Sequence, residues 1–197
     1  MDLPPVGVIL AGGAGRRMGA SGSDGDGKAM VQLAGRPLIE YPAAVLGAVC
    51  DRLAVVCKEG TPLPTLAGWE RWDEPDEPRH PLTGLVHALE QARGPVLVCA
   101  VDMPFVTVAD LRVLWREAAA HPRAGAVVAS SAGGPQPTLA VYAPATLPVL
   151  RTAPPDAPLR RTVRALEPRC VELPGASVRQ VNTPEDLVAA EMVLAAH

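Results

Sequence analysis

The sequence predicts an α/β fold: a three-layer α/β/α domain around a mostly parallel, Rossmann-like sheet. Three features of the 197 residues support this fold class. Short runs rich in valine, isoleucine and leucine recur along the chain, stretches of helical period lie between them, and a glycine-rich segment follows the first run directly. Buried parallel strands joined by crossover helices give this alternation. In such sheets a ligand binds at the carboxyl ends of the strands.

The apolar runs are the expected strands. In chain order they cover residues 6–11, 53–57, 96–101, 126–130 and 138–142. The proline-rich stretches 61–81 and 153–158 are expected to be loops, because neither is followed by an independent set of strands. We therefore expect a single domain that spans residues 1–197.

Helices are expected over residues 38–49 and 83–93, where apolar residues recur at helical spacing. Thr107 can cap a third helix, since Asp110 follows three residues later and completes a capping box. The last helix should open at Thr183, with Pro184 at its first helical position.

Composition excludes several classes of protein. Apolar residues make up 48% and charged residues 20%, so the chain has a core to bury and should fold. A net charge of −3 gives no basic footprint for nucleic acid but allows a small anionic ligand. Residues 1–5 lack the features of a signal peptide, and no segment approaches the ~18 apolar residues of a membrane span. We expect a cytoplasmic protein that binds neither nucleic acid nor membrane.

Cysteine and histidine spacings predict no metal centre built from these residues. The cysteines are Cys50, Cys57, Cys99 and Cys170, and the histidines are His80, His87, His121 and His197. Neither set contains a zinc or redox pair at the usual spacing. We expect reduced, mostly buried thiols.

A glycine-rich segment over residues 10–19 follows the first expected strand. Its glycines let backbone N–H groups approach a polyphosphate without a Cβ in the way, and Arg16 and Arg17 add positive charge. Such a turn, taken alone, fits a structural role as well as a nucleotide loop. The acidic chain can still carry a local basic pocket from Arg16, Arg17 and Lys28.

Three named motifs fail in this region. A dinucleotide fingerprint needs a third glycine where Met18 stands. Residues 22–28 mimic a Walker A loop, but Ala29 replaces the hydroxyl residue that binds magnesium, and the first strand ends some ten residues earlier. Asp24 and Asp26 hint at a calcium loop, but Lys28 occupies its third ligand position.

Asp102 follows the expected strand 96–101 and so lies at the carboxyl edge of the sheet. A magnesium ion held there could bridge phosphate oxygens and neutralise charge that builds on a transferring nucleotidyl group. The alternative is an aspartate that only initiates a turn before Pro104.

Several segments together resemble the molybdenum cofactor guanylyltransferases, which are nucleotidyltransferases of the nucleotide-diphospho-sugar transferase type. They are residues 10–19, Lys28, 35–38, 81–84, 99–105 and 181–187, which match nearly the whole chain in the right order. The resemblance implies transfer of GMP from GTP to molybdopterin carrying molybdenum, with release of pyrophosphate. It also implies Mg²⁺ as cofactor, GTP and molybdopterin as ligands, and contact with proteins that deliver or receive the cofactor.

The resemblance also implies roles for single residues. The nucleotide would lie on the backbone of Leu10, Ala11, Gly12, Gly13 and Gly15, with Arg16, Arg17 and Lys28 at its phosphates, Asp102 on magnesium, and Asp73 at the nucleotide. Lys28, Arg17 and Asp102 would be catalytic. Asn182, Arg160 and Arg161 would face the pterin. The residues alone leave alternatives open: Asp73 as a solvated charge, Asn182 as a helix-entry residue, and the arginines as a solvated helix face.

The chain departs from the family at three places. Residues 20–27 lengthen the loop before Lys28, and we expect this loop to order on nucleotide binding. Cys57 stands where some members have an asparagine that helps to read the base, and His80 stands where a glycine is usual. These two departures leave CMP transfer, or transfer to another small phosphate acceptor, as alternatives, with a non-catalytic nucleotide-binding protein as a third. Lys58 is expected to be a solvated surface residue.

Overall fold

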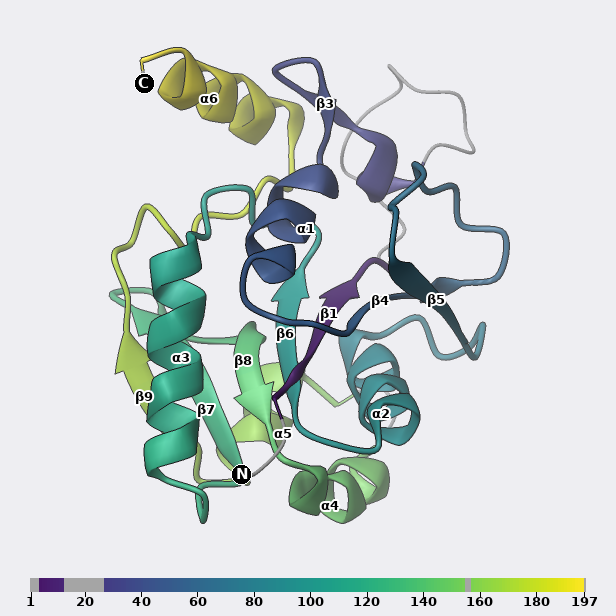
Figure 1. The fold of residues 1–197 in the computed structure, drawn as a ribbon, viewed down its shortest axis with the longest axis vertical. Helices are drawn as coiled ribbons and strands as arrows, with labels where there is room; N and C mark the ends of the chain where they lie inside the picture. Colours follow the sequence, from purple (N-terminus) through teal and green to yellow (C-terminus); the bar gives the residue numbers. More distant parts are fainter. Residues whose placement is uncertain (1–3, 13–26, 155–156, 197) are drawn as a thin grey trace.

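The computed structural model describes residues 4–12, 27–154 and 157–196, and its centre is a seven-stranded sheet (Figure 1). The strands lie in the order β5-β4-β1-β6-β8-β7-β9. Their bounds are β1 Val6–Leu10, β4 Leu53–Lys58, β5 Trp69–Glu74, β6 Val96–Ala100, β7 Ala126–Ser131, β8 Gly134–Tyr142 and β9 Arg169–Glu172. Neighbouring strands run parallel, except that β8 is antiparallel to both β6 and β7.

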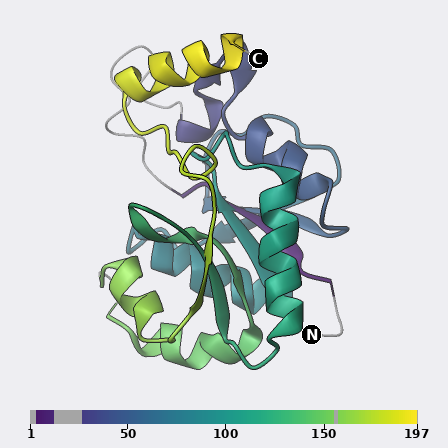
Figure 2. The same ribbon diagram turned by 90° about the vertical axis from the view of Figure 1, so that its left-hand side faces the viewer.

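Helices cover both faces of the sheet, which gives the expected three layers (Figure 2). One face carries α1 (Glu40–Gly47) and α3 (Val108–Ala120), and its core includes Leu46, Leu111 and Leu114. The other carries α2 (Pro81–Ala92), α4 (Leu147–Thr152) and α5 (Leu159–Arg164). β6 is buried along its whole length, as a strand covered on both faces must be.

A third, smaller core lies beyond the carboxyl ends of β1 and β6. Here α6 (Pro184–Ala195) packs against the hairpin of β2 (Gln32–Leu33) and β3 (Arg36–Pro37). The short 3₁₀ helix η1 (Lys28–Met30) precedes this hairpin, and a second, η2 (Pro144–Thr146), leads into α4. This arrangement brings the C-terminal part of the chain over the edge of the sheet where ligands are expected.

The predicted fold class and all five predicted strands are confirmed, with small differences at their ends. The capping box predicted at Thr107 is present before α3, and the last helix, α6, starts after Thr183 with Pro184 at its first position, as predicted. Thr183 also forms a capping box, which was not predicted. The interpretation of residues 61–81 as a loop was wrong, because β5 forms there as an edge strand. Helix α5 begins directly after Pro158, the last residue of the second predicted loop, and strand β9 was not predicted.

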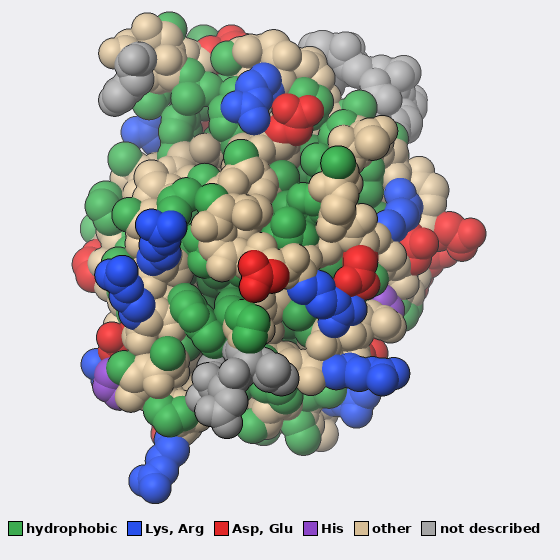
Figure 3. Space-filling view, viewed as in Figure 1, with side chains coloured by type: hydrophobic (Ala, Val, Ile, Leu, Met, Phe, Trp, Pro, Cys, Tyr) green, Lys and Arg blue, Asp and Glu red, His purple; other side chains and the backbone are tan. Residues whose placement is uncertain are grey.

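The cysteines and the charged surface can be compared with the predictions from composition. Cys50, Cys57 and Cys99 are buried and Cys170 is exposed, and all four thiols are free, as expected. On the face shown in Figure 3, Lys and Arg side chains are scattered among acidic ones and form no single basic field. Among the described residues, no helix combines the length and the apolar character that crossing a membrane requires.

Candidate active site

Three residues predicted for the site lie together at the carboxyl edge of the sheet. The Lys28 Nζ atom donates to Asp102 Oδ2 at 2.7 Å and to Asn182 Oδ1 at 2.7 Å. The Lys28 side chain is 10% exposed and that of Asp102 15%, so the ion pair is largely removed from water. The three residues are up to 154 positions apart in sequence and come from η1, the end of β6 and the turn before α6.

Backbone contacts hold these side chains in place. The Val181 N–H donates to the Asp102 carbonyl at 2.9 Å, which ties the turn before α6 to the end of β6. The Asn182 N–H then donates to Asp186 Oδ2 at 2.9 Å, and the same oxygen completes the capping box at Thr183. These hydrogen bonds, first of all that from the Asn182 backbone, lower the pKa of Asp186. The cap of α6 thus also orients Asn182.

The end of β1, which leads into the predicted glycine-rich loop, lies beside this cluster. Leu10 ends β1, and the Ala11 N–H continues the ladder by donating to the Val56 carbonyl at 2.8 Å. Gly12 is the last described residue before the loop. The other predicted loop residues, Gly13, Gly15, Arg16 and Arg17, lie outside the described residues, as does the lengthened segment 20–26.

Asp73 lies at the other end of this edge, on β5. Its side chain is about half exposed and pairs with Arg71, whose Nε atom is 2.7 Å from Asp73 Oδ1. The same oxygen accepts from the buried Cys57 Sγ at 3.8 Å. Burial raises the pKa of Cys57 to about 11, so the residue is a neutral thiol at pH 7.

Arg160 and Arg161 are both exposed on α5. Arg160 reaches back to the hairpin between β7 and β8, where it contacts the Gly133 carbonyl at 3.4 Å and Gln136 Oε1 at 3.5 Å. In the described part of the chain, no hydrogen bond or ion pair joins either arginine to the cluster around Lys28.

Sequence reasoning missed a buried acid, Glu74, and misplaced its partner. Lys58 is only 5% exposed, so the expectation that it is a solvated surface residue was wrong. Its Nζ atom lies 3.4 Å from Glu74 Oε1 and also donates to the Pro75 carbonyl. Burial raises the pKa of Glu74, and the charge of Lys58 opposes this. Period-two alternation in a strand over 69–74 would have predicted it, because Trp72 and Glu74 then point to the same buried face.

His80, which departs from the family pattern, has a local role at the start of α2. Its Nδ1 atom accepts from the Leu82 N–H at 3.2 Å and so caps the helix, with Pro81 at the first helical position. A glycine here could not provide that side-chain acceptor.

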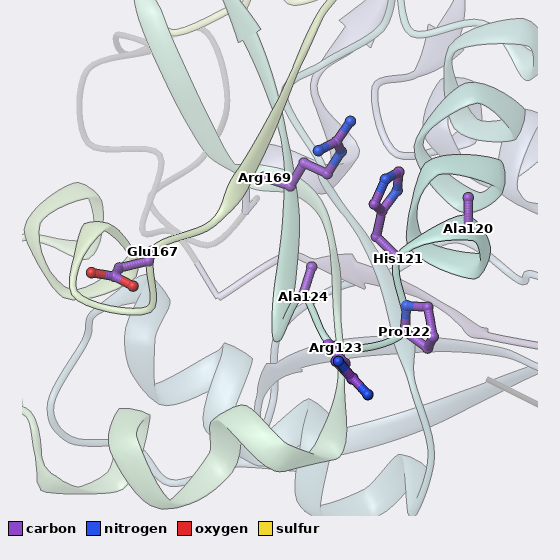
Figure 4. Close-up of a pocket in the computed structure, with 7 residues that line it drawn as sticks. All are labelled: Ala120, His121, Pro122, Arg123, Ala124, Glu167 and Arg169. Carbon is purple, nitrogen blue, oxygen red and sulfur yellow. The ribbon is translucent and has the colours of Figure 1, made fainter.

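A hollow of about 600 Å³ lies at the opposite end of the sheet (Figure 4). Its lining comes from the end of α3 and the turn after it, with His121 and Arg123, and from the start of β9, with Arg169. These elements meet at the amino ends of β7 and β9, away from Asp102. Ligands of open α/β sheets bind at the carboxyl ends of the strands, so this hollow lies at the end of the sheet where no ligand is expected.

Comparison with known families decides the relationship. Residues 7–170 match the family described as the MobA-like NTP transferase domain. The chain belongs to this family. The match includes Lys28, the Lys58–Glu74 pair and Asp102, and it ends before the turn that carries Asn182.

A curated relative supports the same relationship, and two solved structures share the fold. A probable molybdenum cofactor guanylyltransferase of Synechococcus elongatus is 31% identical over 149 residues, which is 73% of this chain and 74% of that protein. The structure of molybdopterin-guanine dinucleotide biosynthesis protein A from Archaeoglobus fulgidus covers 98% of this chain and 100% of its own, with 23% identity and a TM-score of 0.74. A Mycobacterium tuberculosis protein solved in complex with manganese covers 96% of this chain and 99% of its own, with 18% identity and a TM-score of 0.74.

Within the described ranges, two carboxylates at this edge of the sheet, those of Asp102 and Glu74, each have a buried oxygen without a hydrogen-bond partner. Asp102 Oδ1 is buried and has no hydrogen-bond partner among the described residues, which leaves it as a free ligand. Magnesium is commonly bound by one or two carboxylates together with substrate phosphates, so this residue fits such an ion. Within the described ranges, no group of three or more His, Cys, Asp or Glu residues is placed to hold a metal ion, at this site or at any other.

Proposed function

We propose that this chain is a molybdenum cofactor guanylyltransferase, which transfers GMP from GTP to the phosphate of molybdopterin carrying molybdenum. One observation carries the proposal: Lys28, Asp102 and Asn182 meet at the carboxyl edge of the sheet, beside the end of β1. The family match and the name of the Synechococcus relative supply the reaction. We further propose that residues 1–197 act as one nucleotidyltransferase domain, in which α6 and its cap complete the site.

The reaction brings two anions together. An oxygen of the molybdopterin phosphate forms a bond to the α-phosphorus of GTP, the bond from that phosphorus to the β-phosphate oxygen breaks, and pyrophosphate leaves with the electron pair. Catalysis of such a step is mostly positioning and charge neutralisation. Lys28 is suited to this role, because its ammonium is a compact charge held in a largely buried position.

Asp102 would hold the magnesium ion, and its free Oδ1 atom supports this assignment. Such an ion would supply positive charge that offsets the negative charge of the phosphates. The Lys28 ammonium donates one N–H to Asp102 Oδ2 and one to Asn182 Oδ1. Its third N–H would be available to the triphosphate while Asn182 keeps the side chain in place.

Other roles in the proposal follow from the family resemblance. Leu10, Ala11 and Gly12 would hold the nucleotide through their backbone, and Asp73 would contact it. Arg16 and Arg17, with the glycines of the same loop, would meet the phosphates. Asn182, Arg160 and Arg161 would face the pterin, and the cofactor would arrive from or pass to a protein partner.

The test is to incubate the purified chain with Mg²⁺, molybdate-loaded molybdopterin and one nucleoside triphosphate at a time. Pyrophosphate release and the mass of the product are then measured. We expect release with GTP and a product heavier by GMP. If none of the nucleoside triphosphates gives pyrophosphate release, the proposal as a whole is overturned.

The same experiment decides the base. Cys57 is a buried neutral thiol where some family members carry an asparagine, so its side chain offers the base no amide group. This observation keeps CMP transfer to the same cofactor as a second candidate. Release with CTP alone would establish it in place of GMP transfer.

A further inference from the structure

The Lys58–Glu74 pair lies directly beside the start of the nucleotide loop. A Cβ atom on residue 12 would overlap Glu74 Oε1, far inside van der Waals contact. On the other side, a Cβ on Gly84 would lie 2.9 Å from Glu74 Oε2. The carboxylate thus lies between Gly12, two residues beyond the end of β1, and Gly84 in the first turn of α2. Both glycines belong to segments that carry the family resemblance.

This contact explains why residue 12 is a glycine, and it does so without any phosphate close to the backbone. The side of Gly12 where a Cβ would project is filled by the carboxylate of Glu74. The position of the backbone at residue 12 therefore depends on where Glu74 lies. Glu74 is in turn held by Lys58, whose Nζ atom also donates to the Pro75 carbonyl.

Stability alone does not explain such a pair. Lys58 is 5% exposed and Glu74 6%, so both charges have lost most of their water. A well-packed apolar pair of similar volume would be at least as stable as a buried ion pair. Glu74 Oε2 is also buried without a hydrogen-bond partner among the described residues, which adds a further cost. A charged pair in this position is better explained by what it orients.

Strand order shows what lies on either side. Along β5-β4-β1-β6, the residues at the carboxyl edge are Glu74, Lys58, Gly12 and Asp102 in that order. Gly12 therefore lies between the Lys58–Glu74 pair and the Lys28–Asp102 pair. Three strand spacings separate β5 from β6, which is roughly 14 Å and suits an extended nucleoside triphosphate.

We propose that Glu74, held by Lys58, is a positioning residue for the nucleoside triphosphate and acts through the backbone of Gly12. The inference rests on the proposed function, because it needs the nucleotide to lie on residues 10–12. Glu74 does not touch the reacting atoms. Its loss should therefore weaken nucleotide binding while the step that depends on Lys28 and Asp102 continues.

The first test measures GTP binding by isothermal titration calorimetry, with Mg²⁺ and without the pterin acceptor. Glu74→Gln keeps the shape of the side chain and removes its charge, and Lys58→Met removes the partner charge. We expect each to raise the Kd for GTP about tenfold, as a misplaced binding group does. In turnover assays KM for GTP should rise by a similar factor, with kcat within about twofold of wild type.

Glu70→Gln is the matched control. Glu70 lies on the same strand and the same face, but its ion pair with Arg52 is exposed, so this variant should bind GTP like wild type. If Glu74→Gln also binds GTP like wild type, the inference is wrong and the proposed function stands. If wild type itself binds no GTP, the proposed function fails and takes the inference with it.

A second test uses the contact itself. Gly12→Ala should weaken GTP binding because its Cβ displaces Glu74. If this contact is the cause, Gly12→Ala with Glu74→Ala should bind GTP no worse than Glu74→Ala alone, since both changes break one contact. Melting temperatures should show the same non-additivity, even in a variant that binds no nucleotide. Losses that simply add would overturn the inference.

Discussion

Asp102→Asn tests both the function and the energetics of the Lys28–Asp102 pair. Removing one member of a buried ion pair costs about 3–5 kcal/mol of unfolding free energy when the other charge is left uncompensated. Here the Lys28 Nζ atom keeps Asn182 Oδ1 as an acceptor, and the new amide oxygen can also accept. We therefore expect a loss of about 2 kcal/mol, below that range. For a chain of this size the loss corresponds to a fall of about 4–8 °C in melting temperature.

Adding Lys28→Met to Asp102→Asn separates the effect on stability from the effect on turnover. The double variant carries no unpaired buried ammonium, so it should recover about 1 kcal/mol or more of the lost stability. Turnover should behave differently. It should fall by about 100-fold or more in Asp102→Asn and stay low in the double variant, because the carboxylate proposed to hold the metal is absent in both.

Urea unfolding followed by tryptophan fluorescence gives the free energies, and pyrophosphate release gives the turnover. The two single variants and the double variant form one cycle. If their stability losses add, the two charges do not stabilise each other and the reasoning from burial is refuted. If Asp102→Asn turns over at the wild-type rate, Asp102 is not part of the site.

Four further outcomes are expected. Asn182→Ala should lower turnover about tenfold by leaving Lys28 with one acceptor; an unchanged rate in the pyrophosphate assay would contradict this. Thr107→Ala should cost about 1 kcal/mol in urea unfolding, and Thr107→Ser should restore most of it. Because the pKa of Asp186 is lowered in the fold, its stabilisation is present above the ordinary value of about 4 and is lost as pH falls through the folded pKa; Asp186→Asn should flatten that acid slope. EDTA should abolish pyrophosphate release and added Mg²⁺ should restore it, whereas activity that persists in EDTA would exclude the ion.

The central strands could be predicted because burial on both faces leaves a continuous apolar run. β1 and β6 both show such a run in the sequence, and each is buried along nearly its whole length. The edge strands could not be found by the same signal. β5 is buried at only two of its six positions and β9 at none, so neither has an apolar run. Their pairing with β4 and β7 is a tertiary effect that overrides local propensity.

Part of the site could be predicted because its residues follow strands or precede helices. Asp102 directly follows a predicted strand, and Asn182 directly precedes a helix cap that the sequence shows. That Asn182 contacts Lys28 could not be predicted, because 154 positions separate them and only the fold brings them together. Glu74 was missed for a related reason: without the strand β5, nothing indicated that this acid points inward.

The two lysines of the chain share an environment that explains why they are not arginines. Sixteen of the 18 basic residues are Arg, yet both Lys58 and Lys28 are buried, and each pairs with one carboxylate. A compact ammonium fits such a site, whereas a planar guanidinium needs room and partners for five donors. Gly12 lies between the two pairs in strand order. The chain thus uses lysine in place of its usual arginine at these two positions. In the proposed site, each must place a compact positive charge beside the nucleotide loop.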